Sequence, residues 1–252
     1  MISFPFLKKE LKELVKTNKL IIFGALFIFF AILSPLTARF MTEIFNSIGG
    51  MDGFVFPPAV FTDSYLQFFS NHSLNVLVLA LIISGTIVSE KNKGSLSLVL
   101  SKGLERRKLV LTKLFSYSLF FSFLYWISVA ITYLYTYLLF EEAYIEKLFV
   151  AFFTTWLYGI FLIVLAIFIS TISVSFGMAA GITFGAYTLV SIIGSIPIFN
   201  INRLSPSYLN SITSGIIYSG DSSHLLITTL STIAIILILI YLSVEIFKNK
   251  EI

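Results

Sequence analysis

The densest group of charged side chains in this sequence lies between Ser89 and Lys113, in the stretch SEKNKGSLSLVLSKGLERRKLVLTK. Nine of the chain's thirty charged residues fall within these twenty-five positions, and seven of the nine are Lys or Arg. Basic side chains suit anionic headgroups or steering toward a protein partner, and they also fix the orientation of a membrane protein. A helix over LSLVL would place Leu96, Val99 and Leu100 on one face. That face is either an anchor for a partner pocket or a contact with this chain's own helix ends.

Groups that could catalyse a reaction are scarce in the rest of the sequence. Without cysteine the chain can form neither a disulfide nor a thiolate metal site. His72 and His224 are isolated, and both fall at or outside the ends of the apolar segments, which is poor material for a metal site. The serines have no buried base beside them, and no GxxxxGK[ST] phosphate loop is present. We therefore predict that the chain is not an enzyme, binds no cofactor or metal itself, and depends on another subunit for any energy.

The composition indicates a membrane protein. Hydrophobic residues make up 57% and charged residues 12% of the 252 positions, whereas soluble domains contain about 25% charged residues. A membrane-crossing helix needs about 20 mostly apolar residues, and the alternating strands of a membrane barrel are absent. We predict an all-α integral membrane protein with six transmembrane helices, an external loop at residues 39–73 and a single transmembrane domain over residues 1–252. The predicted spans run approximately over residues 20–38, 74–89, 114–140, 148–170, 173–196 and 225–244.

The basic residues divide unequally between the two sides of the predicted membrane. Six spans place both termini on one side, and fourteen of the seventeen Lys and Arg fall on that side. Only Arg39, Lys147 and Arg203 fall on the other. Cytoplasmic segments carry such an excess, so both termini and the loop at residues 90–113 are predicted to be cytoplasmic. This distribution disfavours a nucleic-acid partner, and we expect the membrane to be that of a bacterial cell. The absence of charge from the span cores disfavours an ion-coupled carrier.

Two segments outside the spans have helical patterns. Residues 3–19 carry apolar side chains at helical spacing, namely Phe4, Leu7, Leu11, Leu14 and Val15, with lysines on the other face. This pattern predicts an amphipathic helix in the membrane interface, in contact with lipids. The alternative is a solvated extension of the first span. Residues 205–216 begin with Ser-Pro, a cap followed by a first-turn proline, and predict a short extracellular or re-entrant helix before the last span.

Three glycines form a stripe in the fifth predicted span. Gly177, Gly181 and Gly185 are four positions apart and therefore lie on one helix face. Small residues along one face allow two helix backbones to approach closely in a membrane. The stripe is either a seam with a second copy or partner, or an ordinary packing surface inside the chain.

Residues 90–113 resemble a loop of the permease subunits of type-2 ATP-binding-cassette (ABC) exporters. In that family the loop between the second and third spans reads acidic residue, glycine, short leucine-rich helix, break, basic pair and final lysine, as this chain does from Glu90 to Lys113. The span count, the N-terminal helix and the segment before the last span agree with the family. Many members have proline at the break, where this chain has Lys102-Gly103, but glycine also ends a helix by adopting a left-handed conformation.

The resemblance implies a coupling helix, at about residues 94–101, that docks in a groove of a separate cytoplasmic ABC ATPase. ATP and magnesium would bind that ATPase. Two ATPase copies and a second permease, identical or paralogous, would complete the exporter. The residues assigned to docking are Glu90, Gly94, Ser95, Leu96, Leu98, Val99, Leu100, Gly103, Arg106 and Arg107.

The cargo is predicted to be apolar or amphipathic, because the spans lack charge and are rich in Phe, Tyr, Ile and Leu. We favour amphipathic peptides, including antimicrobial or cytolytic ones, and leave lipids and hydrophobic drugs as alternatives. Two other hypotheses remain open: an ATP-independent secondary carrier or channel, and a membrane assembly or immunity factor that transports nothing.

Overall fold

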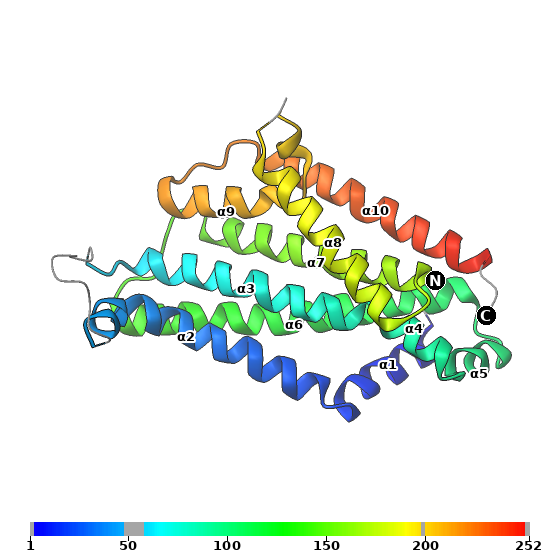
Figure 1. The fold of residues 1–252 in the computed structure, drawn as a ribbon. Coiled ribbons are helices and arrows are strands. Elements are labelled where there is room, and N and C mark those ends of the chain that lie inside the picture. Colours follow the sequence, from blue (N-terminus) through cyan, green and yellow to red (C-terminus); the bar gives the residue numbers. More distant parts are fainter. Residues whose placement is uncertain (1–2, 48–57, 198–199, 250–252) are drawn as a thin grey trace.

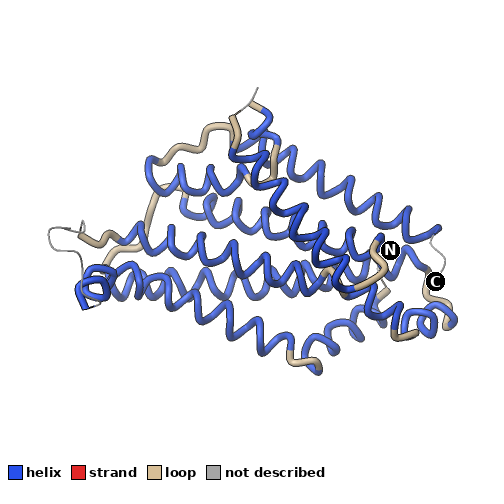
Figure 2. Tube along the Cα trace, viewed as in Figure 1, coloured by secondary structure: helices blue, strands red, loops and turns tan. Residues whose placement is uncertain are grey.

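Helices form all of the regular structure in residues 3–47, 58–197 and 200–249, which are the residues that the computed structural model describes (Figures 1 and 2). Helices satisfy backbone hydrogen bonds within one segment, as a lipid environment demands. In chain order they are α1 (Phe4–Lys16), α2 (Lys19–Ser47), α3 (Phe61–Ile83), α4 (Thr86–Asn92), α5 (Ser95–Ser101), α6 (Arg106–Phe140), α7 (Leu148–Ile172), α8 (Phe176–Ser195), the 3₁₀ helix η1 (Ile201–Leu204), α9 (Tyr208–Ser219) and α10 (Leu225–Asn249).

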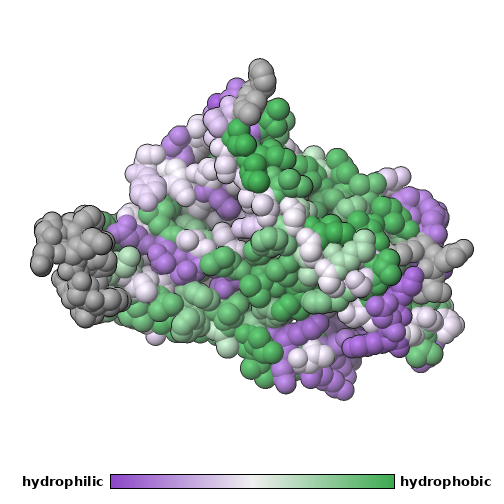
Figure 3. Space-filling model, in the orientation of Figure 1, coloured by the Kyte–Doolittle hydropathy of each residue, from purple (hydrophilic) through white to green (hydrophobic). Residues whose placement is uncertain are grey.

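Six stretches of the described chain are helical, apolar and long enough to cross a bilayer. They are α2, α3 together with α4, α6, α7, α8 and α10. A helix of about 20 residues rises about 30 Å, which matches the hydrocarbon thickness of a membrane. The space-filling view shows broad hydrophobic surface over the middle of the molecule (Figure 3). The predicted all-helical fold with six candidate spans is therefore confirmed.

The second span begins earlier than the sequence predicted. Helix α3 starts at Phe61 rather than at Leu74, so part of the predicted external loop is helical. The polar residues before Leu74 interrupt the apolar pattern of the sequence, but their side chains contact other helices inside the bundle. Asn71 Nδ2 donates to Ser34 Oγ of α2 at 3.0 Å, and His72 packs among aromatic rings. The middle of that predicted loop lies outside the described residues.

Helix α7 lies at the centre of the bundle. Its residues Ile163, Ala166 and Ile167 have no exposed surface, and the helix contacts α3, α6, α8, α9 and α10. Helices α2, α3 and α6 pack side by side as a second group (Figure 1). By contrast, α8 and α10 carry many exposed apolar side chains, among them Leu189 and Leu230. These two helices present most of their apolar surface to lipid or to another chain.

A neighbouring helix compensates for a proline inside α2. Pro35 has no N–H group, so the main-chain carbonyl of Ala31 loses its helical hydrogen bond. Thr132 of α6 is fully buried, and its hydroxyl donates to the Ala31 carbonyl at 3.1 Å. Since lipid supplies no water to an unpaired carbonyl, this contact holds α2 against α6.

Replacing Thr132 with valine keeps the shape of the side chain and removes the donor. We expect Thr132→Val to destabilise the protein by roughly 0.6 to 1.7 kcal/mol, as for other hydrogen bonds between membrane helices. The measurement is the free energy of unfolding in mild detergent. In a Pro35→Ala background the new N–H can serve the Ala31 carbonyl, so the same change should cost much less. Equal costs in the two backgrounds would contradict this role of Thr132.

One end of the bundle gathers the elements that the sequence marks as charged. Helices α1, α4 and α5 lie toward the same end as the last turns of α10, whereas α9 lies toward the opposite end (Figure 1). Arg106, at the start of α6, donates to the Lys248 carbonyl of α10 at 3.0 Å and so ties these helices together. We call this end, comprising α1, α4, α5, the first turn of α6 and the last turn of α10, the charged end.

Helices occupy both segments that were predicted to be helical outside the spans, with one correction to α1. Helix α9 covers most of the pattern that precedes the last span. In α1, Leu14 is buried beside Phe6 in the core instead of sharing the membrane face with Phe4, because α1 packs one side onto α6. The outward groove of α1 is lined by Phe4, Leu7, Lys8, Leu11, Lys12, Val15 and Lys16. Apolar side chains with flanking lysines suit a membrane interface.

Candidate functional site

Helix α5 is a short element held between two glycines. Gly94 precedes it with φ +70° and Gly103 follows it with φ +88°, a region that only glycine adopts without strain. The hydroxyl of Ser95 donates to the Glu90 carbonyl at 3.2 Å and fixes the first turn to the end of α4. The predicted helix at residues 94–101 is therefore present as Ser95–Ser101, and Gly103 makes the break in the left-handed conformation that the sequence predicted.

The apolar side chains of α5 differ in their exposure to solvent. Leu96 is 1% exposed, and Val99 and Leu100 are partly buried against the core of the same chain. Of the two alternatives for this face, the structure shows the contact with this chain's own helices, which cover Leu96 fully and Val99 and Leu100 in part. Leu98 is 66% exposed and lies on the other side. It is the exposed apolar side chain of α5.

A buried lysine closes the loop that carries α5. Lys113 of α6 is 1% exposed, and its Nζ lies 2.9 Å from Glu90 Oε1 at the end of α4. The same ammonium lies 3.0 Å from Glu10 Oε2 of α1, a carboxylate whose side chain is 3% exposed. A buried charge is tolerated only when it is paired, and here one ammonium is paired with two carboxylates from different helices. The two ends of the loop, residues 90 and 113, are thereby fixed to each other and to α1.

Lys9 and Glu13 extend this ion-pair network toward solvent. Lys9 Nζ lies 3.1 Å from Glu10, 3.0 Å from Glu13 and 3.1 Å from Glu90. Burial alone would lower the pKa of Lys9, but the charges of Glu10 and Glu90 outweigh it and the pKa is raised. Burial would raise the pKa of Glu13, yet the hydrogen bond from Lys9 and its charge hold that pKa below its usual value. Both groups are therefore charged at neutral pH.

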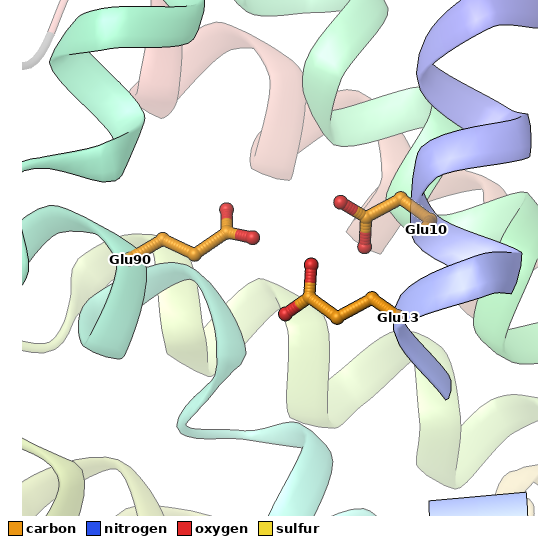
Figure 4. A group of neighbouring side chains, drawn as sticks. All are labelled: Glu10, Glu13 and Glu90. Atoms are coloured by element: carbon orange, nitrogen blue, oxygen red, sulfur yellow. The ribbon is translucent and has the colours of Figure 1, made fainter. Parts of the chain in front are cut away.

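The three carboxylates of the network point toward one another. Glu10 and Glu13 come from α1 and Glu90 comes from α4 (Figure 4). Their oxygens lie within 4.8 Å of one another, a spacing that could hold a metal ion. The Lys9 ammonium contacts all three, and Lys113 contacts Glu10 and Glu90, so two ammonium groups lie among the three carboxylates.

Sequence reasoning placed Glu90 in the docking surface and missed Glu10 of α1, which shares the Lys113 ammonium with Glu90. Glu10 stands four positions from both Phe6 and Leu14, and all three are buried on one face of α1. A single acidic residue within an apolar stripe signals a buried ion pair, because burial of an unpaired carboxylate is too costly. That signal predicts a lysine partner without saying which of the many lysines it is.

The basic pair lies beside α10. Arg106 and Arg107 line a groove between the first turns of α6 and the last turns of α10, together with Lys248. Both arginines were predicted to belong to the docking surface of α5, which stays a prediction. In the structure they also lie beside α10.

The glycine stripe of α8 faces outward. Gly177, Gly181 and Gly185 are exposed, and a Cβ added at any of them would meet nothing of this chain within 4 Å. By contrast, a Cβ on Gly159 of α7 would lie 2.2 Å from the Phe121 ring. Close packing inside this chain therefore explains Gly159 but does not explain the stripe.

His72 lies inside the bundle, which corrects the prediction that both histidines fall at or outside span ends. Its side chain is 3% exposed. The ring centroid lies 4.6 Å from that of Tyr125, 5.5 Å from Phe27 and 5.7 Å from Phe68. The early start of α3 accounts for the difference. Surrounded by these rings, the imidazole is part of an aromatic core.

These features define the class of protein: a multi-pass helical membrane protein with a short helix mounted on a loop at its charged end. A family model described as "ABC-2 family transporter protein" matches residues 5–251, so the chain belongs to this family. The resemblance found in the sequence is thereby confirmed. No curated protein matches the chain. The protein is a membrane subunit of an ABC transporter, and subunits of this kind work with an ATPase subunit.

The ion-pair network can be tested at Lys113. We expect Lys113→Met to destabilise the protein by on the order of 3 kcal/mol, because Glu10 and Glu90 are left with one buried cation fewer. The measurement is the free energy of unfolding in mild detergent. Adding Glu10→Gln should recover part of the loss, since it removes one of the two carboxylates.

The matched control for this variant is Lys108→Met. Lys108 lies on the same helix but is 37% exposed and pairs with Glu105 at the surface, so its removal should change stability by less than about 1 kcal/mol. A Lys113→Met protein as stable as the control would show that the buried network does not hold the charged end together.

Proposed function

We propose that this chain is the permease of an exporter driven by a separate ATPase, and that the ATPase receives helix α5 in a groove. The observation that carries the proposal is the mounting of α5: an exposed Leu98 on a helix whose base is closed by the buried contact between Lys113 and Glu90. An apolar side chain that projects from a fixed base suits a partner pocket. ATP and magnesium bind the ATPase in this proposal, and two ATPases serve two permeases.

The mounting of α5 supports a path for force. A pull on α5 reaches α4 through the first turn and reaches α6 through Lys113. It reaches α1 through Glu10. Helix α6 continues through the membrane as one helix of 35 residues, and α4 belongs with α3 to another span. Movement of a seven-residue helix is thus delivered to two spans and to α1.

The orientation and the cargo belong to the same proposal. The charged end faces the bacterial cytoplasm, because fourteen of the seventeen Lys and Arg lie in the segments assigned to that side. The cargo is an amphipathic peptide, with lipids or hydrophobic drugs as the alternatives. This choice is supported by the apolar outer faces of α8 and α10. Membership of an ABC transporter family speaks against an ATP-independent carrier.

Leu98 provides the test of docking. We expect Leu98→Asp to reduce co-purification of the ATPase with a tagged permease at least about tenfold, because a carboxylate cannot enter an apolar pocket without a large cost. The fold should remain, since Leu98 is exposed. Recovery is measured by nucleotide hydrolysis and by protein staining after extraction in mild detergent.

The control for this test is Leu204→Asp, which places the same charge on an exposed leucine of η1. It should retain the ATPase in full. Full retention and full ATP turnover with Leu98→Asp would refute docking through α5. Leu96→Asp is unsuitable as a docking test, because Leu96 is buried and its replacement disturbs the fold.

We also propose that the glycine stripe of α8 is the seam with the second permease. Gly181→Leu fills a face on which close approach requires small residues, so the dimer should dissociate to monomer on a native gel. Ala234→Leu adds similar bulk to an exposed position of α10 and should leave the dimer intact. An unchanged oligomer with Gly181→Leu would exclude this seam.

A further inference from the structure

A groove at the charged end lies between the first turns of α6 and the last turns of α10. Its volume is about 670 Å³. The side chains that line it are polar toward the end of the bundle and apolar toward the middle. They are Glu105, Arg106, Arg107, Glu245 and Lys248 on the polar part, and Leu111, Leu237, Ile240, Tyr241 and Val244 on the apolar part.

The polar part of the groove has an excess of positive charge. Glu105 is held by Lys108, whose hydrogen bond lowers the pKa of that carboxyl, and Glu245 lies 3.9 Å from Lys248. Among the side chains that line the groove, the basic residues Arg106, Arg107 and Lys248 outnumber the two carboxylates. Arg106 is fixed in the groove by its hydrogen bond to the Lys248 carbonyl. An anion at this point would meet donors from two helices.

The apolar part continues along one face of α10. Leu237, Tyr241 and Lys248 follow at helical spacing, and the rise from the first to the last is roughly 16 Å. Leu237 is 61% and Tyr241 66% exposed, so this chain leaves the face uncovered. The distance matches a headgroup together with the upper part of an acyl chain. An anionic headgroup above apolar chains is the combination that both parts of the groove fit.

We propose that this groove binds one anionic phospholipid. The phosphate lies near Arg106, Arg107 and Lys248, and an acyl chain covers Leu237 and Tyr241. A soluble partner fits less well, because the apolar part belongs to a span of the bundle. The proposal concerns a bound lipid and does not depend on α5 docking, on the cargo or on which side of the membrane the charged end faces.

The test uses the purified full-length permease without an ATPase, in mild detergent. Native mass spectrometry counts the phosphatidylglycerol, phosphatidylcholine or phosphatidylethanolamine molecules retained as each lipid is titrated. We expect one phosphatidylglycerol per chain to bind at least about tenfold more tightly than either other lipid. The triple variant Arg106→Gln, Arg107→Gln, Lys248→Gln should lose at least about tenfold in affinity. Each basic group near a phosphate contributes roughly fivefold to the affinity, and the variant removes three of them.

A matched variant removes the same number of charges elsewhere at the charged end: Lys91→Gln, Lys93→Gln, Lys102→Gln. It should keep the affinity for phosphatidylglycerol. Arg107→Gln alone, at an exposed position outside the core, should lose about threefold and guards against a folding defect in the triple variant. An equal loss in the matched variant, or equal retention of the three lipids, would overturn the proposal. A triple variant that turns dimer into monomer would show a protein seam there instead.

Discussion

The buried ammonium of Lys113 is the interaction on which the charged end depends. A lysine that is 1% exposed must be paired, and its partners come from α1 and α4 while the lysine itself belongs to α6. Without this ammonium, Glu10 and Glu90 would share only the more exposed ammonium of Lys9. Apolar packing could hold the same helices together, but it would not fix their register as a three-point contact does. The network therefore sets where α5 stands relative to the spans.

A second set of features sets the position of helix α5. The left-handed backbone at Gly94 and Gly103 turns the chain sharply at both ends of the helix, and Leu96 is sealed into the core between them. Buried Leu96 and the hydrogen bond from Ser95 to the Glu90 carbonyl thus attach α5 to the bundle and to α4. In the proposed transporter this makes α5 a lever whose displacement reaches the spans directly.

The sequence was sufficient for the parts of the fold that local hydrophobicity determines. The six spans follow from apolar runs that must lie in lipid, and the short helices follow from helical spacing and caps. The start of α3 was missed because Asn71 and His72 look unfit for a span until their tertiary partners are known. The pairing of Glu10 with Lys113 joins residues far apart in the chain, and local patterns cannot select among many lysines. Contacts with neighbouring helices likewise determine which leucines of α5 are buried, and local patterns cannot predict those contacts.

The outer faces of α8 and α10 differ in their chemistry. The face of α8 has the glycine stripe, which has little apolar area to offer lipid chains but allows a helix backbone to approach closely. The face of α10 has large apolar side chains, with arginines of α6 and Lys248 above them, which acyl chains and a headgroup cover well. In the proposed exporter, a second permease would bind the face of α8 and a lipid would bind the face of α10. Since α8 and α10 are different spans on the outside of the same bundle, the two need not compete.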